Sequence, residues 1–127
     1  MATTKTRILK LKIRLYCGDE IAMGPGKADL LDAIAETGSI SAAARRLGMS
    51  YRRAWLLVDA MNRCFTDRLV ETRPGGGQKA GASVTPVGEQ VLAAYRALAE
   101  LADECSRGDA YASLEAGLRD APLPPAD

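Results

Sequence analysis

The sequence has no histidine, only three cysteines, and few aromatic residues, among them one tryptophan and one phenylalanine. Cys17, Cys64 and Cys105 are far apart and form no Cys-x-x-Cys pair, so we expect neither a zinc site nor a disulfide framework. We interpret them as buried structural thiols, with a redox sensor as the alternative. The sequence also lacks paired carboxylates in an apolar setting and a nucleophile beside a base. It therefore predicts no enzyme, no cofactor and no metal site.

Long apolar runs are also missing, and none approaches the roughly 20 residues that a transmembrane helix needs. The polar amino terminus does not resemble a signal sequence, so we expect a cytoplasmic protein without membrane association. A chain of 127 residues fits one domain, which we expect at residues 1–119, with a disordered proline-rich tail at 120–127. Its 47% hydrophobic content is ordinary for a globular domain.

Acidic residues are absent between Ser39 and Val58, where the chain carries four arginines. This segment predicts two short helices that cross closely, because the alanines at 43 and 44 leave room and Gly48 permits a left-handed turn. Such a pair is a helix-turn-helix, whose second helix enters the major groove of DNA. Ser50 would cap the second helix. Either Ser39 or Ser41 would cap the first.

Strand patterns flank these helices. Residues 8–17 alternate between apolar and basic side chains, which predicts a half-buried strand. Its basic face is either a solvated edge, the interpretation that we favour, or a contact for DNA or a partner chain. A helix beginning at Pro25 or Lys27 follows. Beyond the helix pair, strands at 69–73 and 82–85 enclose a glycine-rich loop, as in the wing of a winged helix. The sequence thus predicts a mainly α-helical winged helix-turn-helix protein with a small β-sheet and at least one amino-terminal strand.

Pro86 opens a long final helix that we expect to hold two copies of the chain together. Apolar residues recur along it at steps of three or four, close to the spacing of a coiled-coil seam. Gly108 interrupts the pattern, and residues 109–118 predict a further short helix. The seam residues, and therefore the predicted dimer contacts, are Val91, Tyr95, Leu98, Ala102 and Cys105.

The predicted DNA contacts are arginines and polar residues at helix ends and in the wing. Arg52 and Arg53 lie about 100° apart around the second helix, so one can reach base edges while the other holds the backbone. Arginine suits guanine because its parallel N–H groups match O6 and N7. Alternatively both touch only phosphate or solubilise the helix. Arg45 and Arg46 either hold phosphate or stabilise the end of their own helix. We interpret Trp55 as a core or half-core residue, with stacking on a base as the alternative. The full set is Ser39, Ser41, Arg45, Arg46, Ser50, Tyr51, Arg52, Arg53, Arg73, Gln78 and Lys79.

These motifs resemble one family, from about Ile8 to Leu101. The chain is similar there to the DNA-binding domain of ModE-type molybdate-responsive regulators, and its helix-turn-helix alone is shared with LysR-type regulators. The motifs that carry the resemblance are the glycine-rich wing together with Gly38-Ser39-Ile40-Ser41-x-Ala43-Ala44, Met49-Ser50-Tyr51-Arg52-x-Ala54-Trp55, Met61-Asn62, Leu69-Val70-Glu71 and Thr85-x-x-Gly88.

The resemblance implies a homodimer on a palindromic operator, held by the first helix, the last helix and the amino-terminal strands, with Leu31 as a further dimer contact. ModE-type regulators normally carry a carboxyl-terminal molybdate-binding module of two small β-barrels. This sequence ends after the last helix, which leaves a molybdate response open and favours a natural single-domain regulator over a fragment.

We therefore predict a dimeric, sequence-specific transcription regulator of double-stranded DNA, with a link to molybdenum metabolism that rests on the resemblance. Two alternatives remain. The net charge of only +1 and the acidic carboxyl-terminal region favour a winged-helix module that binds protein instead of DNA. Cys105, if two copies meet at the final helix, favours a redox-responsive regulator.

Overall fold

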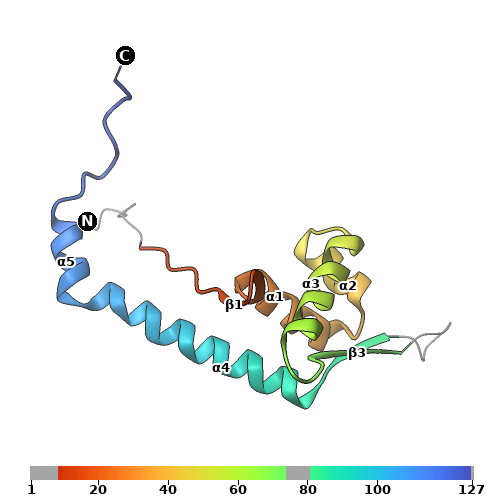
Figure 1. The fold of residues 1–127 in the computed structure, drawn as a ribbon. Helices are drawn as coiled ribbons and strands as arrows, with labels where there is room; N and C mark the ends of the chain where they lie inside the picture. Colours follow the sequence, from red (N-terminus) through yellow and green to blue (C-terminus); the bar gives the residue numbers. More distant parts are fainter. Residues whose placement is uncertain (1–8, 74–80, 127) are drawn as a thin grey trace. The chain divides into compact units, whose positions relative to one another are not determined.

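The computed structural model describes residues 9–73 and 81–126 (Figure 1). By their contacts these residues fall into two parts, of which residues 12–97 form the larger. The larger part contains a β-hairpin, three helices, a second hairpin and most of a long helix, in that order along the chain. The predicted contacts Gln78 and Lys79 lie outside the described residues.

The first hairpin is shorter than the sequence predicts. Strand β1 (Leu15–Cys17) pairs antiparallel with β2 (Glu20–Met23). On the face that we expected to be buried, Leu11 and Leu15 are 49% and 54% exposed. The prediction of a half-buried strand over residues 8–17 is wrong, because the buried residues of this hairpin come from β2, where they are Ala22 and Met23.

Three helices follow, and they confirm the predicted helix-turn-helix. Helix α1 (Pro25–Thr37) starts with proline, whose fixed φ suits the first helical position. Helix α2 (Ile40–Leu47) and helix α3 (Tyr51–Cys64) are joined through Gly48, which has a φ of 69°. Alanines allow α2 and α3 to approach closely, and the almost completely buried ones are Ala43, Ala44 and Ala54.

The core is aliphatic, as the scarcity of aromatic residues predicts. Burying a valine or leucine side chain contributes roughly 1.5–3 kcal/mol, so the completely buried cluster is a major source of stability. Its members come from β2, α1, α3 and the start of the second hairpin. The largest are Met23, Leu30, Leu31, Ile34, Val58, Met61, Leu69 and Val70.

The second hairpin is the wing. Strand β3 (Val70–Arg73) pairs antiparallel with β4 (Gly81–Val84), with Val70 opposite Val84 and Arg73 opposite Gly81. Figure 1 shows this hairpin extending from the three helices beside α2 and α3. Strand β3 starts one residue later than predicted, and β4 starts one residue earlier. The predicted winged helix-turn-helix fold is confirmed.

Asn62 ties α3 to the wing. Its Oδ1 accepts hydrogen bonds from the backbone N–H groups of Leu69 at 2.8 Å and Val70 at 3.2 Å. Its Nδ2 donates to the Val70 carbonyl at 3.1 Å. Leu69 and Val70 are completely buried, so these backbone groups depend on the amide of Asn62.

Replacing Asn62 by leucine should therefore lower the free energy of unfolding by about 2–4 kcal/mol, because two buried N–H groups lose their acceptor. Urea unfolding followed by circular dichroism measures the change. The N62D variant keeps an acceptor oxygen and should lose less. Equal losses in the two variants, or no loss in N62L, would contradict the role of Asn62.

Helix α4 (Pro86–Asp103) begins at the predicted proline. Thr85 caps it: its Oγ1 accepts from the Gly88 N–H at 2.9 Å and donates to the Arg68 carbonyl at 2.7 Å. A Cβ atom added to Gly88 would lie 2.4 Å from the Leu69 carbonyl oxygen. The Thr85-x-x-Gly88 motif thus both starts α4 and lets it pass against the segment that leads into β3.

Two of the predicted dimer contacts are buried inside one chain. Leu31 is completely buried in the core. Tyr95 is 8% exposed, and its hydroxyl donates to the Ile13 carbonyl at 2.9 Å. Both side chains pack within the chain, so in this structure a second copy cannot contact them, and neither is carried forward as a dimer contact. Val91 is half-buried.

Helix α4 ends at Asp103 and is followed by the 3₁₀ helix η2 (Glu104–Arg107) and helix α5 (Asp109–Ala116). The predicted break at Gly108 is confirmed. Cys105 lies in η2, so the α-helical seam that we predicted ends before it, at Asp103. Leu98 and Leu101 are exposed, whereas Ala102 is half-buried.

The cysteines are not the buried thiols that we expected. Cys17 and Cys105 are exposed, and Cys64 is half-buried. A small hairpin and a 3₁₀ turn offer little cover, which is why Cys17 and Cys105 remain open to solvent.

Candidate nucleic-acid interface

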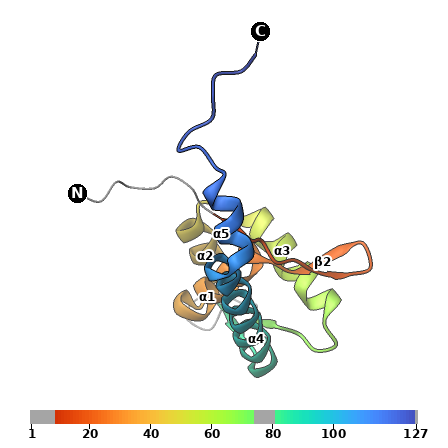
Figure 2. The ribbon, with the colours of Figure 1, turned by 90° about the vertical axis from the view of Figure 1, so that its left-hand side faces the viewer.

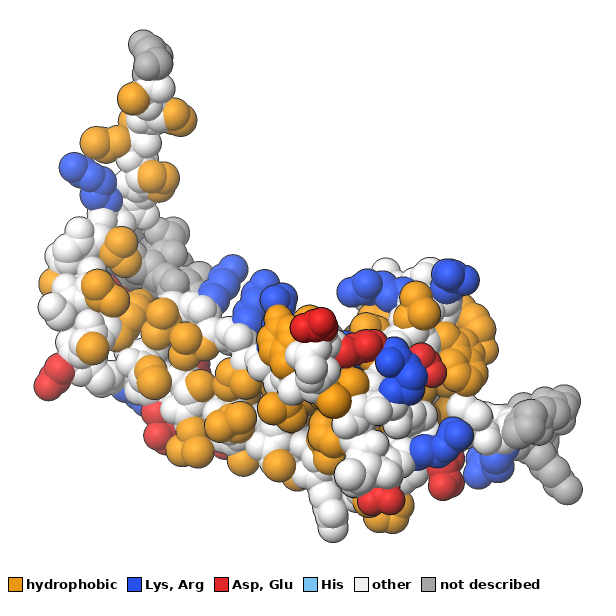
Figure 3. Space-filling view, in the orientation of Figure 1, with side chains coloured by type: hydrophobic (Ala, Val, Ile, Leu, Met, Phe, Trp, Pro, Cys, Tyr) orange, Lys and Arg blue, Asp and Glu red, His pale blue; other side chains and the backbone are white. Residues whose placement is uncertain are grey.

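The first turn of α3 carries basic side chains, and a serine cap fixes the residue at which this helix begins. Ser50 is its N-cap, as predicted, with Oγ accepting from the Arg53 N–H at 3.1 Å. Arg52 and Arg53 follow, both exposed, and this turn contains no acidic residue. Figure 3 shows basic side chains gathered over the end of the molecule where α2 turns into α3. The positive end of the α3 dipole adds to their charge, so this turn attracts anions.

Neither arginine is neutralised by a neighbour. Among the residues that the structure describes, no carboxylate lies within salt-bridge distance of Arg52 or Arg53. The acids instead pair with other arginines. Arg96, for example, lies 2.6 Å from Asp32, which raises the pKa of its guanidinium. Arg46 lies 2.7 Å from Glu36. Arg52 and Arg53 thus form no ion pair with a carboxylate of the described residues.

An aromatic pair lies next to these arginines on α3. The Tyr51 and Trp55 rings meet edge to face, with centroids 6.5 Å apart and planes at 79°. The Trp55 indole N–H donates to the Tyr51 hydroxyl. Trp55 is 38% exposed and does not belong to the core cluster, so the core or half-core interpretation of this residue is wrong. One turn of helix separates the two residues, which is why their side chains are neighbours on the surface of α3.

The start of α2 carries the predicted serines. Ser39 is the N-cap, since its Oγ accepts from the Ala42 N–H at 3.1 Å. Ser41 lies within the first turn, and its hydroxyl is hydrogen-bonded to that of Ser39 at 3.1 Å. The structure therefore selects Ser39 as the cap. Both hydroxyls lie at the amino end of α2, and the Ser39 hydroxyl already accepts from one backbone N–H group of the first turn. At the other end of α2, Arg45 and Arg46 are exposed.

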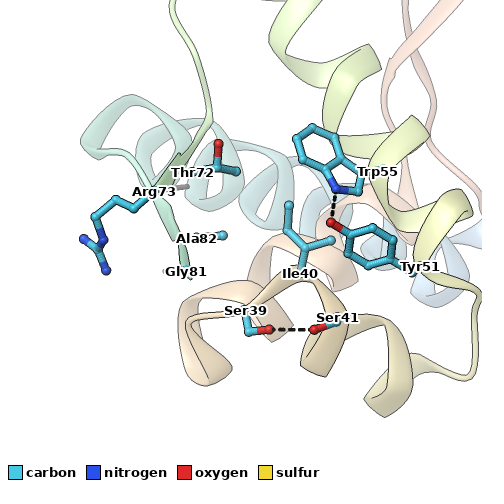
Figure 4. Close-up of a pocket in the computed structure, with 9 residues that line it drawn as sticks. All are labelled: Ser39, Ile40, Ser41, Tyr51, Trp55, Thr72, Arg73, Gly81 and Ala82. Carbon is cyan, nitrogen blue, oxygen red and sulfur yellow. Dashed lines mark hydrogen bonds between the residues drawn. The ribbon is translucent and has the colours of Figure 1, made fainter. Parts of the chain in front are cut away.

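An open cleft of about 340 Å³ lies between α2, α3 and the wing. Figure 4 shows the serine pair on one side of it and the aromatic pair on another, with the wing strands beside them. It brings together four of the predicted DNA contacts, and it leaves Arg45, Arg46 and the first-turn arginines of α3 outside its lining. The lining residues are Ser39, Ile40, Ser41, Tyr51, Trp55, Thr72, Arg73, Gly81 and Ala82.

Five lining residues were missed as site residues by sequence reasoning, and they are Ile40, Trp55, Thr72, Gly81 and Ala82. Trp55 was interpreted by its apolar character, although its position four residues after Tyr51 was the signal for a ridge on one face of α3. Thr72 carries no signal of its own in the sequence. It joins the cleft because it stands opposite Ala82 in the wing.

The wing is fixed to the helices at the edge of this cleft. The Ala82 N–H donates to the Gly38 carbonyl at 2.9 Å. A Cβ atom at Gly81 would lie 2.8 Å from the same oxygen, so the contact requires glycine or a shifted backbone. Gly38 is the left-handed residue that ends α1, directly before the Ser39 cap. This hydrogen bond therefore holds the wing strand β4, which lines the cleft, next to the start of α2.

Among residues 9–73 and 81–126 no group of three or more His, Cys, Asp or Glu side chains could hold a metal ion. In the same residues, no helix combines the length and the apolar character that crossing a membrane requires.

The helix-turn-helix and the wing match known regulators in sequence. Residues 27–89 match the family of bacterial regulatory helix-turn-helix proteins, lysR family. The chain is 50% identical over 76 residues to the molybdenum-pterin-binding protein MopB of Rhodobacter capsulatus, which covers 60% of this chain and 28% of MopB. It is 36% identical over 93 residues to the DNA-binding transcriptional dual regulator ModE of Escherichia coli K12, covering 73% of this chain and 33% of ModE.

Solved structures show the same fold. The DNA-binding domain of CbnR, crystallised as a complex with DNA, superposes with a TM-score of 0.53 at 25% identity. That match covers 69% of this chain and 95% of the CbnR domain. CbnR itself, a LysR family transcriptional regulator, gives a TM-score of 0.50 at 26% identity, over 65% of this chain and 27% of CbnR. The chain spans about a third of the length of its curated relatives MopB and ModE.

Proposed function

We propose that this chain, which carries a helix-turn-helix domain of the lysR family over residues 27–89, binds double-stranded DNA and regulates transcription as a homodimer. The observation that carries the proposal is the exposed, unneutralised pair Arg52 and Arg53 at the capped start of α3. An α-helix with its side chains is about 10–12 Å wide, which fits the major groove of about 12 Å. One of the two arginines reads a guanine edge, and the other contacts the backbone.

The cleft beside α3 takes the phosphate backbone that borders the groove. The Ser39 and Ser41 hydroxyls and the N–H groups at the start of α2 are neutral donors that suit a phosphate oxygen. Arg73 approaches the same strand from the base of the wing, and Tyr51 from α3. Gln78 and Lys79 in the wing, with Arg45 and Arg46 on α2, extend the contact. The complex of the CbnR DNA-binding domain with DNA supports this use of the fold.

A homodimer would present two α3 helices to successive major grooves. Its half-sites would then lie one helical turn apart, about 34 Å, and the operator would be palindromic. Leu98 and Leu101 support the dimer. They are large apolar side chains, exposed about one helical turn apart near the end of α4, and a second chain could cover them. Ala102 and Cys105, in the same part of the chain as these leucines, are further proposed dimer contacts, and Val91 is a proposed contact in residues 12–97.

The curated relatives favour a role in molybdenum metabolism, since MopB and ModE are named for molybdenum-pterin binding and for transcription regulation. The genes that this chain controls would belong to that metabolism. The proposed DNA contacts of the described residues do not require a bound effector.

The proposal is tested by selecting bound sequences from a random duplex pool and titrating the best duplex by fluorescence anisotropy at several salt concentrations. We expect a palindromic consensus and a log–log salt slope of about −0.9 for each phosphate that the protein neutralises. Sedimentation of the protein alone should give the mass of a dimer. Failure to bind any duplex more tightly than about 10⁻⁴ M at low salt would overturn it and favour the protein-binding alternative.

A further inference from the structure

An apolar side chain lies at the centre of the exposed face of α3. Leu56 is 56% exposed. Because an α-helix turns by about 100° per residue, Leu56 lies only about 40° from Arg52 around the helix axis. The completely buried residues Ala54 and Met61 lie on the opposite side of the helix. Leu56 therefore projects away from the core, on the side of α3 that faces DNA in the proposed complex.

Charged residues mark where this face stops attracting DNA. Asp59 and Arg63 follow Leu56 on the same side of α3. Nε of Arg63 lies 2.8 Å from Asp59, and its Nη2 lies 2.5 Å from Glu20. Glu20 belongs to the β1–β2 hairpin, which lies beside the carboxyl end of α3 (Figure 2). Two carboxylates thus face one guanidinium there, so the part of α3 that suits a polyanion runs from Arg52 to Leu56.

The aromatic pair of α3 faces a different part of the proposed complex. Tyr51 and Trp55 line the cleft between α2, α3 and the wing, where we place the phosphate backbone. Leu56 lies about 100° further around the helix than Trp55, away from that lining. The same helix therefore turns its aromatic residues toward the backbone and Leu56, together with Arg52, toward the base edges.

A leucine side chain has no hydrogen-bonding group, so it can recognise only an apolar feature of a base pair. In the major groove that feature is the C5-methyl group of thymine. Four residues of α-helix rise about 6 Å, and successive bases of one strand are about 3.4 Å apart. Leu56 therefore meets bases within about two base pairs of those that Arg52 reaches.

We propose that Leu56 is a specificity-determining residue that packs against the methyl group of a thymine, within about two base pairs of the guanine that Arg52 or Arg53 reads. This inference rests on the proposed DNA binding and deepens it, because it names a second base that each half-site requires. Recognition at that base depends on apolar contact and not on charge.

The test compares the selected duplex with duplexes in which deoxyuridine replaces one thymine of each half-site at a time. Deoxyuridine lacks only the methyl group and keeps the base pair. At one thymine position we expect the affinity of the unaltered chain to fall about 15-fold, or about four-fold per half-site, because each copy loses contact with one buried methyl group. The Leu56→Ala variant should bind the thymine and deoxyuridine duplexes equally well, because it lacks the side chain that contacts the methyl group.

Leu15→Ala is the matched control, because Leu15 lies in β1 and is exposed to nearly the same extent, 54%. It should keep the full preference for thymine over deoxyuridine. Leu56→Met, which keeps an unbranched apolar side chain, should keep most of that preference. Leu56 is exposed, so L56A should unfold in urea as the unaltered chain does, which separates lost recognition from lost folding.

The proposal is overturned if deoxyuridine weakens binding at no thymine within two base pairs of the guanine, if the consensus has no thymine there, or if L56A keeps the preference for thymine. In each of these cases the chain still binds its selected duplex, so the proposed DNA binding stands. Binding to no duplex would instead overturn the proposed function, and this inference with it.

Discussion

Replacing Arg52 and Arg53 together by alanine should weaken binding to the selected duplex about 100-fold or more, since each base-contacting arginine is worth roughly 1–3 kcal/mol. The salt slope should become shallower, because at least one phosphate contact is lost. Both side chains are exposed, so the free energy of unfolding should change by no more than about 0.5 kcal/mol. Anisotropy titration at fixed salt and urea unfolding measure the two quantities separately.

The matched control is R63A/R96A, which removes two arginine charges elsewhere on residues 12–97. Arg63 and Arg96 already pair with carboxylates, Arg63 with Glu20 and Arg96 with Asp29 and Asp32. This control should bind the duplex almost as the unaltered chain does. If R52A/R53A keeps the affinity and the salt slope of the unaltered chain, α3 is not the DNA-reading helix.

The Gly88→Ala substitution should lower the free energy of unfolding by more than about 4 kcal/mol, an exceptional loss for one methyl group. The added Cβ would lie 2.4 Å from the Leu69 carbonyl oxygen and 2.7 Å from Cγ1 of Val84. The first of these is backbone, so α4 must move away from the segment that leads into β3. Thermal unfolding and urea unfolding both measure the loss.

Gly26→Ala is the control for Gly88→Ala, because it adds the same methyl group in α1, where no atom apart from its chain neighbours and the backbone of its own helix lies within 4 Å of the new Cβ. There alanine should stabilise the protein by about 0.5–1 kcal/mol through its higher helix propensity. A similar response of the two variants, in sign and size, would mean that the close contact at Gly88 does not constrain α4.

The helix-turn-helix and the wing were predictable because their signals are local. Gly48 needs a left-handed backbone, Ser50 needs only its own helix to act as a cap, and glycines mark the wing loop. Which serine caps α2, Ser39 or Ser41, could not be predicted from such local signals. Both are good caps by residue type, and only the path of the chain out of Gly38 selects Ser39.

Contacts between distant segments account for what the sequence could not predict. Alternation at residues 8–17 says which side chains share a face, but not that Leu11 and Leu15 remain about half exposed. Periodicity assigned Tyr95 to a seam between two chains, although its hydroxyl reaches Ile13 in its own chain. The cleft likewise depends on the wing meeting the end of α1.

The contact between Ala82 and Gly38 has a mechanical consequence. It joins β4 to the residue that immediately precedes the N-cap of α2. Strand β4 and the start of α2 therefore cannot move apart without breaking this hydrogen bond, and a substitution that shifts the backbone at residues 81 and 82 should also shift the start of α2.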